Sequence, residues 1–518
     1  MTTGAPSAAV PGLRRNMVTI CAMTATIMQA LDTTIANVAL PYMQGTLSAS
    51  QDQINWVLTS YIVAAAIMTA PVGWIANRFG RKRIFIICSA GFTIASVMCG
   101  LAQDIGQMVL FRLLQGVFGA ALVPLSQAVM LDSYALHERA KAMAIWGMGV
   151  MMGPIMGPSL GAWLTETYSW HWVFFVNLPF GIITVLGLVI FMDETKKNLE
   201  LRFDWFGFTA LAIAIGALQL ALDRGEQLGW LESNEIIAEF IIAGIGFYYF
   251  LAHSLTTDRP FIQFALFKDK NFVSGCVFMA VMGLVLFSTM ALSSPFLQNV
   301  IGYPIITAGL LLASRGCGTF VAMMLVGRIM RYIEARTLII SGLSLTAASL
   351  FYMTGWTDQT GVTEIVVISV VQGFGFGLVF VPLSTVAFLT LPNHLRTDGT
   401  SMLTLMRNVA SSIGISLVIA QLTQGSRYTY AVLSEHINPF NHALQMPNVR
   451  GMIDLTTDTG RAMADMMVKV QAQIIAFSHD YQMVMIFTAC AIPLAIMIGS
   501  TKAALRAQSA APDHAVIE

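Results

Sequence analysis

Two charged side chains that lie inside long apolar stretches are the residues best placed to do chemistry. Asp32 stands in the apolar run 17–41, and Arg112 stands in the run 107–131. An ionisable group inside a membrane span is costly, so it normally pairs with another group or faces a cavity. Burial opposes the charged form of a carboxylate and a nearby cation favours it, so a proton could bind and leave as access to water changes. The pattern indicates proton coupling or, alternatively, a static buried ion pair.

The elements that must position these residues are membrane-spanning helices. Of the 518 residues, 56% are hydrophobic and only 11% are charged, less than half the charged share of a soluble protein. This composition excludes soluble enzymes and disordered chains, and with a net charge of zero it gives no reason to expect a nucleic-acid partner. Runs of about 20 apolar residues, enough to cross about 30 Å of hydrocarbon as helix, recur throughout. They predict an all-α polytopic membrane protein with fourteen spans, at 17–41, 55–76, 84–102, 107–131, 142–165, 172–192, 205–222, 235–254, 271–293, 304–326, 337–356, 363–390, 401–423 and 481–501.

The Lys and Arg residues predict how the spans are oriented. With a cytoplasmic N-terminus, about 20 of the 28 fall in inside segments, whereas the six short outside loops hold only Arg224. Both termini are therefore expected in the cytoplasm. In this orientation Asp32 lies about 14 Å from the outer end of its span, and Arg112 lies about five residues inside the outer end of its own. The two side chains are at depths where they could meet.

An internal repeat divides the spans into two groups. Three landmarks recur about 257 residues later: Gln115-Gly116-Val117-Phe118-Gly119 as Gln372-Gly373-Phe374-Gly375, Val123-Pro124-Leu125-Ser126 as Val381-Pro382-Leu383-Ser384, and His137-Glu138-Arg139 as His394-Leu395-Arg396. Both copies cross the membrane in the same direction, which indicates a parallel repeat. The predicted parts are a cytoplasmic N-terminus 1–16, a six-helix bundle 17–192, a linker 193–270 with two extra spans, a second six-helix bundle 271–501 that includes a long outside loop 424–480, and a cytoplasmic tail 502–518.

Several motifs resemble those of the major facilitator superfamily. The segment from Gly73 to Lys82 is similar to that family's loop motif G-x-x-x-D-R-x-G-R-K, with Asn77 where the family usually has Asp. The segments 112–116 and 153–158 resemble the helix 4 motif and the helix 5 antiporter motif. Residues 31–41 resemble the helix 1 signature of the fourteen-helix drug:proton antiporters, and within that group the chain is most similar to the EmrB type.

The resemblance implies a function and a set of partners. It implies a proton-coupled antiporter that exports lipophilic drugs or toxic compounds across the bacterial inner membrane, with substrates, protons and membrane lipid as its ligands. A periplasmic adaptor (a membrane fusion protein) and an outer-membrane channel would complete a tripartite system. The alternative is a narrow-substrate exporter or importer on the same fold, working without an adaptor, since fold does not fix function.

The site residues divide into four sets. Asp32 and Arg112 are the expected proton-coupling pair. Asn37, Gln115 and Arg315 are expected in the substrate cavity, where Arg315 would attract acidic amphiphiles or hydrogen-bond backbone carbonyls. The inner gate is expected from Arg78, Gly80, Arg81 and Asp132, with Asp132 pairing to Arg81. The antiporter seam is expected from Gly153, Pro154, Gly157 and Pro158 of helix 5. The glycines, at a spacing of four, form a stripe that permits close helix contact, and the prolines can kink the helix. The resemblance implies that this stripe faces the other half of the protein.

The outside loop 424–480 contains an amphipathic segment from Arg461 to Phe477. Its apolar residues recur at helical spacing, so it is expected either to lie on the membrane surface or to dock the adaptor. Neither a cofactor nor a metal is expected. The six cysteines lie in apolar runs without ligand spacing, and no Walker A pattern is present for ATP-driven pumping.

Overall fold

The computed structural model describes residues 12–135, 138–195, 197–200, 202–257, 260–330, 332–392, 395–438, 441, 444, 446 and 454–495, without the side chains of residues 51, 52 and 154. Within this part of the chain every regular element is a helix. Thirteen helices are long and apolar enough to span a membrane, and fourteen spans result if one bent helix pair counts as a single span. The predicted all-α membrane protein is confirmed.

The helices fall into two bundles and an intervening pair. The first bundle comprises α1 (Gly12–Thr46), α2 (Gln51–Thr69), α3 (Val72–Phe79), α4 (Arg81–Gly100), α5 (Ile105–Gly119), α6 (Leu122–Ser133), α7 (Arg139–Thr167), α8 (Trp172–Phe175) and α9 (Asn177–Phe191). The intervening segment comprises α10 (Trp205–Leu228), η2 (Trp230–Glu232), α11 (Asn234–Thr256) and η3 (Phe264–Lys268). The second bundle comprises α12 (Lys270–Pro295), η4 (Phe296–Val300), α13 (Ile305–Ile329), α14 (Ala335–Met353), α15 (Val362–Val386), α16 (Arg396–Ser434) and α18 (Asp458–Leu494).

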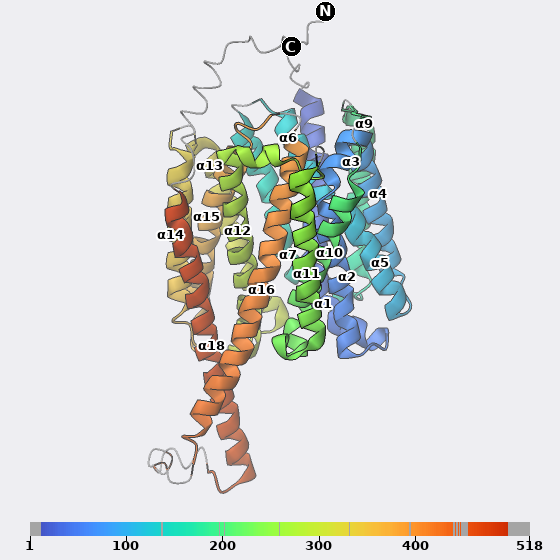
Figure 1. Cartoon of the computed structure of the whole chain (residues 1–518). Coiled ribbons are helices and arrows are strands. Elements are labelled where there is room, and N and C mark those ends of the chain that lie inside the picture. Colours follow the sequence, from blue (N-terminus) through green and yellow to red (C-terminus); the bar gives the residue numbers. More distant parts are fainter. Residues whose placement is uncertain are drawn as a thin grey trace, which may run out of the picture.

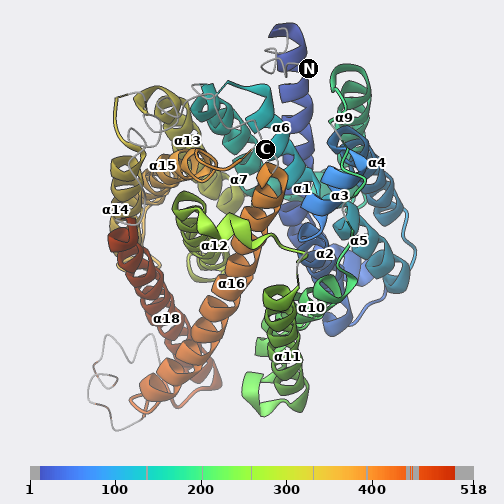
Figure 2. The ribbon, with the colours of Figure 1, turned by 45° about the horizontal axis from the view of Figure 1, so that its top comes forward.

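Helix α10 lies beside both bundles, against α2 of the first and α16 of the second (Figures 1 and 2). Two polar contacts hold it there. The Asp223 carboxylate accepts a hydrogen bond from Thr59 of α2, and the Gln219 amide donates to Ser412 of α16 at 2.9 Å. The extra pair of helices therefore bridges the two bundles along one side.

Short polar side chains start several of the helices. The Ser50 hydroxyl accepts a hydrogen bond from the Gln53 backbone N–H, and Asp104 and Asp269 do the same for α5 and α12. These caps satisfy backbone donors that have no partner inside the helix. They mark where the chain turns at the ends of the spans.

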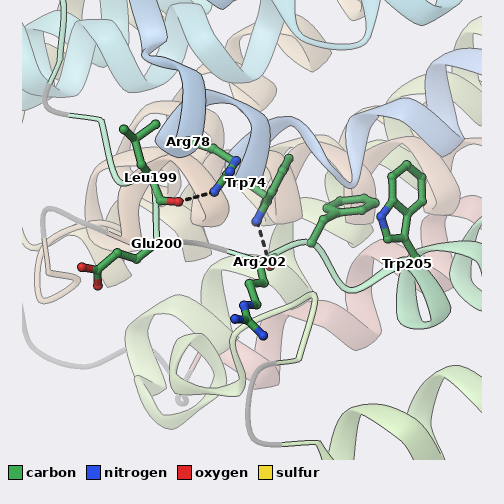
Figure 3. A pocket seen from close by; sticks show the side chains of 7 residues that line it. Trp74, Arg78, Leu199, Glu200, Arg202 and Trp205 are labelled. Atoms are coloured by element: carbon green, nitrogen blue, oxygen red, sulfur yellow. Dashed lines mark hydrogen bonds between the residues drawn. The ribbon is translucent and has the colours of Figure 1, made fainter.

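The second span bends by 56° between α2 and α3, at Ala70 and Pro71. Proline has no backbone N–H and cannot continue the helical hydrogen-bond pattern. The linker that leads to α10 then lies over α3: the Trp74 indole donates to the Arg202 carbonyl at 3.2 Å, and Arg78 donates to the Leu199 carbonyl (Figure 3).

The glycine stripe of α7 faces α1 of the same bundle, and the expectation that it faces the other half is wrong. A Cβ atom on Gly153 would collide with the backbone of Ala30, and one on Gly157 would collide with the Thr34 side chain. The Thr34 hydroxyl also donates to the Gly153 carbonyl at 3.0 Å. A spacing of four puts small residues on one face of a helix, but it does not say which neighbour covers that face. Pro158 is half-buried, and the Pro154 side chain lies outside the description.

The contact between the halves uses the opposite face of α7, and there the second bundle supplies the glycines. Gly309 of α13 lies against Ser159, and a Cβ on Gly316 would collide with Ile155. Nearer the predicted cytoplasmic side, Trp146 of α7 stacks on Phe380 of α15 with ring centroids 5.8 Å apart. Close packing thus holds the two bundles together along α7 and α13.

Helices α16 and α18 extend beyond the bundles as a helical hairpin, seen at the bottom of Figure 1. Residues 424–434 and 458–480, expected in a loop, continue the two spans as helix. The amphipathic segment from Arg461 to Phe477 is therefore the first half of α18 and does not lie flat on a membrane. Tyr430 of α16 donates to Asp465 at 2.5 Å and links the two arms.

We predict that Gly157→Ala destabilises the first bundle, because its Cβ has no room beside Thr34. Overpacking of this kind costs about 1–3 kcal/mol. The expected result is a lower unfolding temperature for the detergent-purified protein, measured by intrinsic fluorescence. Gly327→Ala is the matched control, since the nearest atom to its Cβ is 3.6 Å away. Equal unfolding temperatures for the two variants would contradict the packing described.

Candidate functional site

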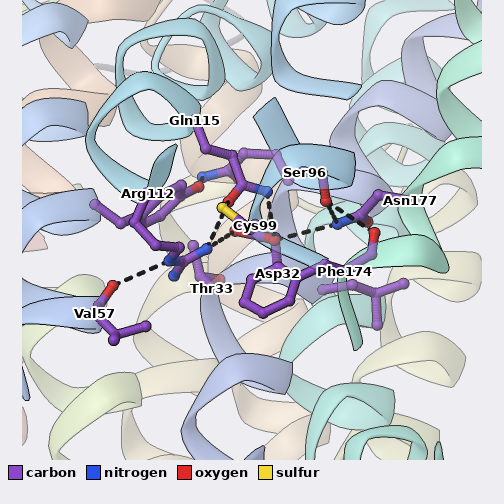
Figure 4. A network of polar contacts seen from close by, with 12 residues as sticks. Asp32, Thr33, Val57, Ser96, Cys99, Arg112, Gln115, Phe174 and Asn177 are labelled. Atoms are coloured by element: carbon purple, nitrogen blue, oxygen red, sulfur yellow. Dashed lines mark hydrogen bonds and ion pairs between the residues drawn. The ribbon is translucent and has the colours of Figure 1, made fainter. Parts of the chain in front are cut away.

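The first bundle encloses a network of polar side chains around Asp32 (Figure 4). One Asp32 oxygen accepts a hydrogen bond from the Arg112 guanidinium at 2.7 Å. The other accepts from the side-chain amides of Gln115 at 2.8 Å and Asn177 at 3.2 Å. All four residues are fully buried. Donors from α5 and α9 thus surround the carboxylate, and they stabilise its charged form.

Arg112 is held on its other sides as well. Its Nε donates to the Val57 carbonyl of α2 at 3.0 Å, and its terminal nitrogen also donates to the Gln115 side-chain oxygen at 2.8 Å. The guanidinium lies 4.3 Å from the centre of the Tyr61 ring and 5.6 Å from that of Phe174. Aromatic faces attract a cation most strongly where water is excluded. The cation therefore keeps several partners of its own beside the carboxylate.

A second layer of contacts orients the side-chain amides of Asn177 and Gln115. The Asn177 amide donates to the Ser96 hydroxyl at 2.9 Å, and Ser96 donates to the Phe174 carbonyl at 2.9 Å. The Cys99 thiol lies 3.6 Å from the Gln115 side-chain oxygen. These contacts leave the side-chain N–H groups of Asn177 and Gln115 pointing at Asp32. The arrangement holds one buried carboxylate among donors from two other helices.

A second set of charges joins the two halves at the predicted cytoplasmic side. Asp132, at the end of α6, forms an ion pair with Arg81 of its own bundle. Its other oxygen binds Arg396, the first residue of α16 in the second bundle, at 2.8 Å. The arginine side chains are buried and Asp132 is about one-third exposed. We call Asp132, Arg81 and Arg396 the inner clasp.

Beside the inner clasp, Asp398 of α16 lies against α3. Its carboxylate accepts a hydrogen bond from the Asn77 amide at 3.3 Å. A Cβ on Gly73 would collide with Asp398, so glycine at this position permits the approach of the two bundles. The carboxylate that the loop motif usually carries at position 77 is therefore replaced here by one on the facing helix.

The other expected gate residues shape the turn between α3 and α4. Gly80 has a φ of 96°, which favours glycine, and a Cβ there would collide with Glu194. Arg78 binds the linker rather than the inner clasp, through the Leu199 carbonyl. The structure thus brings Arg81 and Asp132 together and places Arg78 and Gly80 around them.

The three residues expected in the substrate cavity have different surroundings. Asn37 is exposed on α1. Gln115 is fully buried and belongs to the Asp32 network, where it binds both charges. Arg315 is buried in the second bundle, where it donates to Ser293 at 3.3 Å, while its Nε has no hydrogen-bond partner among the described residues.

Sequence reasoning missed four residues of these networks: Asn177, Ser96, Arg396 and Asp398. Asn177 is a polar residue at the start of a strongly apolar helix, which is a usable signal. Arg396 ends the third landmark of the internal repeat and corresponds to Arg139, and Asp398 lies two residues further along the chain. Among the described residues, no group of three or more His, Cys, Asp or Glu side chains is arranged to hold a metal ion.

Comparisons with known proteins agree with this architecture. The model of the Major Facilitator Superfamily matches residues 22–415. Over 444 residues the chain is 34% identical to the multidrug export protein EmrB of Escherichia coli (strain K12), covering 85% of this chain and 86% of that protein. It is 33% identical to the fatty acid resistance protein FarB of Neisseria gonorrhoeae, covering 82% of this chain and 84% of FarB. The fold is similar to that of the proton:xylose symporter XylE, with a TM-score of 0.56 at 14% identity over 93% of this chain and 96% of XylE.

We predict that Asn77→Asp opens the predicted cytoplasmic side, because it places a second carboxylate against Asp398. Repulsion between two charges about 4 Å apart reaches about 4 kcal/mol at an effective dielectric constant of 20. The measurement is the distance between spin labels on Ala135 and Tyr332, exposed residues of the two bundles, in a cysteine-free protein. We expect the population to shift towards longer distances.

The double variant Asn77→Asp/Asp398→Asn serves as the control. It exchanges the acid and the amide across the contact, so the hydrogen bond can form again and the short distances should return. An unchanged distance distribution in the single variant would contradict a role for this contact in closure.

Proposed function

The chain belongs to the Major Facilitator Superfamily, and we propose that it is a proton-coupled antiporter that exports lipophilic drugs or toxic compounds. It is a multi-pass transporter of the bacterial inner membrane rather than an enzyme, and its substrates are small molecules. The functions in the names of EmrB and FarB, multidrug export and fatty acid resistance, support export of apolar compounds here. We further propose that it works as the inner-membrane part of a tripartite efflux system.

The observation that carries proton coupling is the fully buried Asp32–Arg112 pair. A carboxylate in this position keeps its charge only while its donors are in place, because an unpaired buried charge is strongly unfavourable. Protonation of Asp32 removes the charge that attracts Arg112 and leaves the cation to Gln115, the Val57 carbonyl and the Tyr61 ring. A proton arriving from the outer side would therefore change how α1 is held against α5.

The coupling to substrate follows from where the network lies. Asp32 is on α1, and two residues further along the same helix Thr34 is packed against Gly153 of α7. On its opposite face α7 packs against α13 of the other bundle. A shift of α1 relative to α5 is thus passed through α7 to the interface between the halves. The inner clasp and the Asn77–Asp398 contact would then open or close the cytoplasmic side of the protein to substrate.

The α16–α18 hairpin supports the proposal of an adaptor. Met463, Met466 and Met467 lie on α18 beyond the bundles and are 48%, 68% and 50% exposed. Flexible, apolar methionine side chains suit contact with a partner helix. Ile474 and Phe477, further along the same helix, are buried and belong to the bundle. We propose that only the outer part of the stripe, from Met463 to Met467, meets the adaptor.

We predict that Asp32→Asn abolishes coupled export, because the change is nearly isosteric and removes only the titratable charge. Inverted membrane vesicles with an imposed proton gradient would be loaded with a fluorescent lipophilic dye. Wild-type protein should accumulate the dye and lose this activity when the gradient is dissipated, whereas the variant should not respond to the gradient.

Two controls make the result interpretable. Asp32→Asn and Arg112→Ala each remove one partner of the buried pair, so both should unfold at a lower temperature than the wild type, by an amount that corresponds to as much as about 3–5 kcal/mol. The transport result is therefore read only from purified variants that still unfold cooperatively. Gradient-driven accumulation by Asp32→Asn, or accumulation that needs ATP and no gradient, would contradict the proposal.

For the hairpin, we predict that Met466→Glu abolishes drug resistance in cells but leaves dye transport in vesicles intact. A charge on this exposed face disturbs a partner while leaving the helix folded. Ile474→Glu is the contrasting variant, since a charge at this buried position should reduce both activities. If Met466→Glu affects neither assay, the exposed methionines do not bind an adaptor.

A further inference from the structure

A cavity of about 690 Å³ lies between α3 and the linker that precedes α10, outside the networks described above. Figure 3 shows the side chains that line it. It is lined by Trp74, Arg78, Leu199, Glu200, Arg202, Phe203 and Trp205. The Asp32 network and the inner clasp contain none of these side chains. Arg78 also helps to form the turn between α3 and α4.

The walls of the cavity are held by contacts between α3 and the linker. The Asn198 backbone N–H donates to the Asn77 carbonyl at 3.0 Å, and the Trp74 indole donates to the Arg202 carbonyl at 3.2 Å. The Trp74 and Phe203 rings pack with centroids 4.6 Å apart. Two separate stretches of chain therefore form one preorganised site.

The charges of the lining favour an anion. Arg78 and Arg202 contribute two guanidinium groups, against one carboxylate from Glu200. Figure 3 shows the Glu200 carboxylate pointing away from both guanidinium groups. The Arg202 side chain is exposed, so its donors are accessible to a ligand. Guanidinium groups bind phosphate oxygens through paired, directional hydrogen bonds.

The position of the cavity favours a lipid. Helix α10 starts at Trp205, which is 71% exposed, and tryptophan is enriched at the boundary between headgroups and hydrocarbon. Phe206 and Ile213 are 54% and 48% exposed, and a spacing of seven residues places them on the same face of α10. An apolar track thus leads from the cavity along a membrane span.

We propose that this cavity binds the headgroup phosphate of an anionic phospholipid, with the acyl chains lying along α10. Arg78 and Arg202 bind the phosphate, Trp74 and Trp205 flank the glycerol, and Phe206 and Ile213 contact an acyl chain. Because Asn77 binds the linker through its carbonyl and Asp398 of the second bundle through its side-chain amide, the bound lipid holds α3 and the linker in the arrangement that accompanies inner closure.

The test is lipid binding to the full-length purified protein, measured by native mass spectrometry. Phosphatidylglycerol is titrated against phosphatidylcholine of the same acyl chains, for the wild type, Arg202→Gln and Arg328→Gln. Arg328 is the matched control, since it is an exposed arginine in the last turn of α13, also on the predicted cytoplasmic side. One basic residue near an anionic lipid changes affinity about fivefold.

We expect the wild type to retain phosphatidylglycerol in preference to phosphatidylcholine, Arg202→Gln to bind it about fivefold more weakly, and Arg328→Gln to bind it like the wild type. Equal losses in the two variants, or no loss in either, would overturn the proposal.

Glycerol 3-phosphate is the soluble probe. If it displaces phosphatidylglycerol from the Arg202 site at equal concentration, free phosphate esters are the ligands and the lipid is not. Unfolding temperatures of all variants report on folding, and binding is measured without transport, so the result stands apart from that of the proposed export.

Discussion

The cost of a carboxylate inside the hydrocarbon is the constraint on which the first bundle depends. Asp32 receives hydrogen bonds from α5 and α9, and Arg112 of α5 is bound in turn by α2. Removing one partner from a buried pair costs about 3–5 kcal/mol, because the remaining charge has no compensation. One acid thus fixes four helices relative to one another. The charged acid therefore holds the first bundle together as one unit.

The second bundle repeats the helix arrangement with Thr289 at the position that corresponds to Asp32. Gln372 and Ser369 occupy the positions that correspond to Gln115 and Arg112 in the repeat, and both are fully buried. The Gln372 side-chain oxygen and the Ser369 hydroxyl have no hydrogen-bond partner among the described residues. A duplicated topology therefore carries two different chemistries. The buried ion pair belongs to one half, and the other half holds the cation Arg315 and the acid Asp480, both buried.

The sequence predicts the parts of this structure that follow from hydropathy and depth. The spans, and the level at which Asp32 and Arg112 meet, follow from helix rise and the cost of burial. The neighbour of a small-residue stripe does not, because Gly153 and Gly157 pack equally well against any helix. The length of α16 and α18 does not follow from hydropathy either, since polar residues beyond the membrane are compatible with helix or loop. Asp398 was missed because it comes into contact with Asn77 only when the bundles meet.

The two charge networks differ in what it costs to break them, and this difference separates gate from coupling site. Asp132 is about one-third exposed, whereas its partners Arg81 and Arg396 are buried while the inner clasp is closed. Opening the clasp returns these charges to water, which offsets the loss of the ion pairs and brings the open and closed states closer in free energy. The Asp32 network is fully buried, so its donors cannot leave a charged acid at comparable cost. Under the proposed coupling, this network changes state when a proton neutralises the carboxylate, and the partly exposed inner clasp then opens or closes in response.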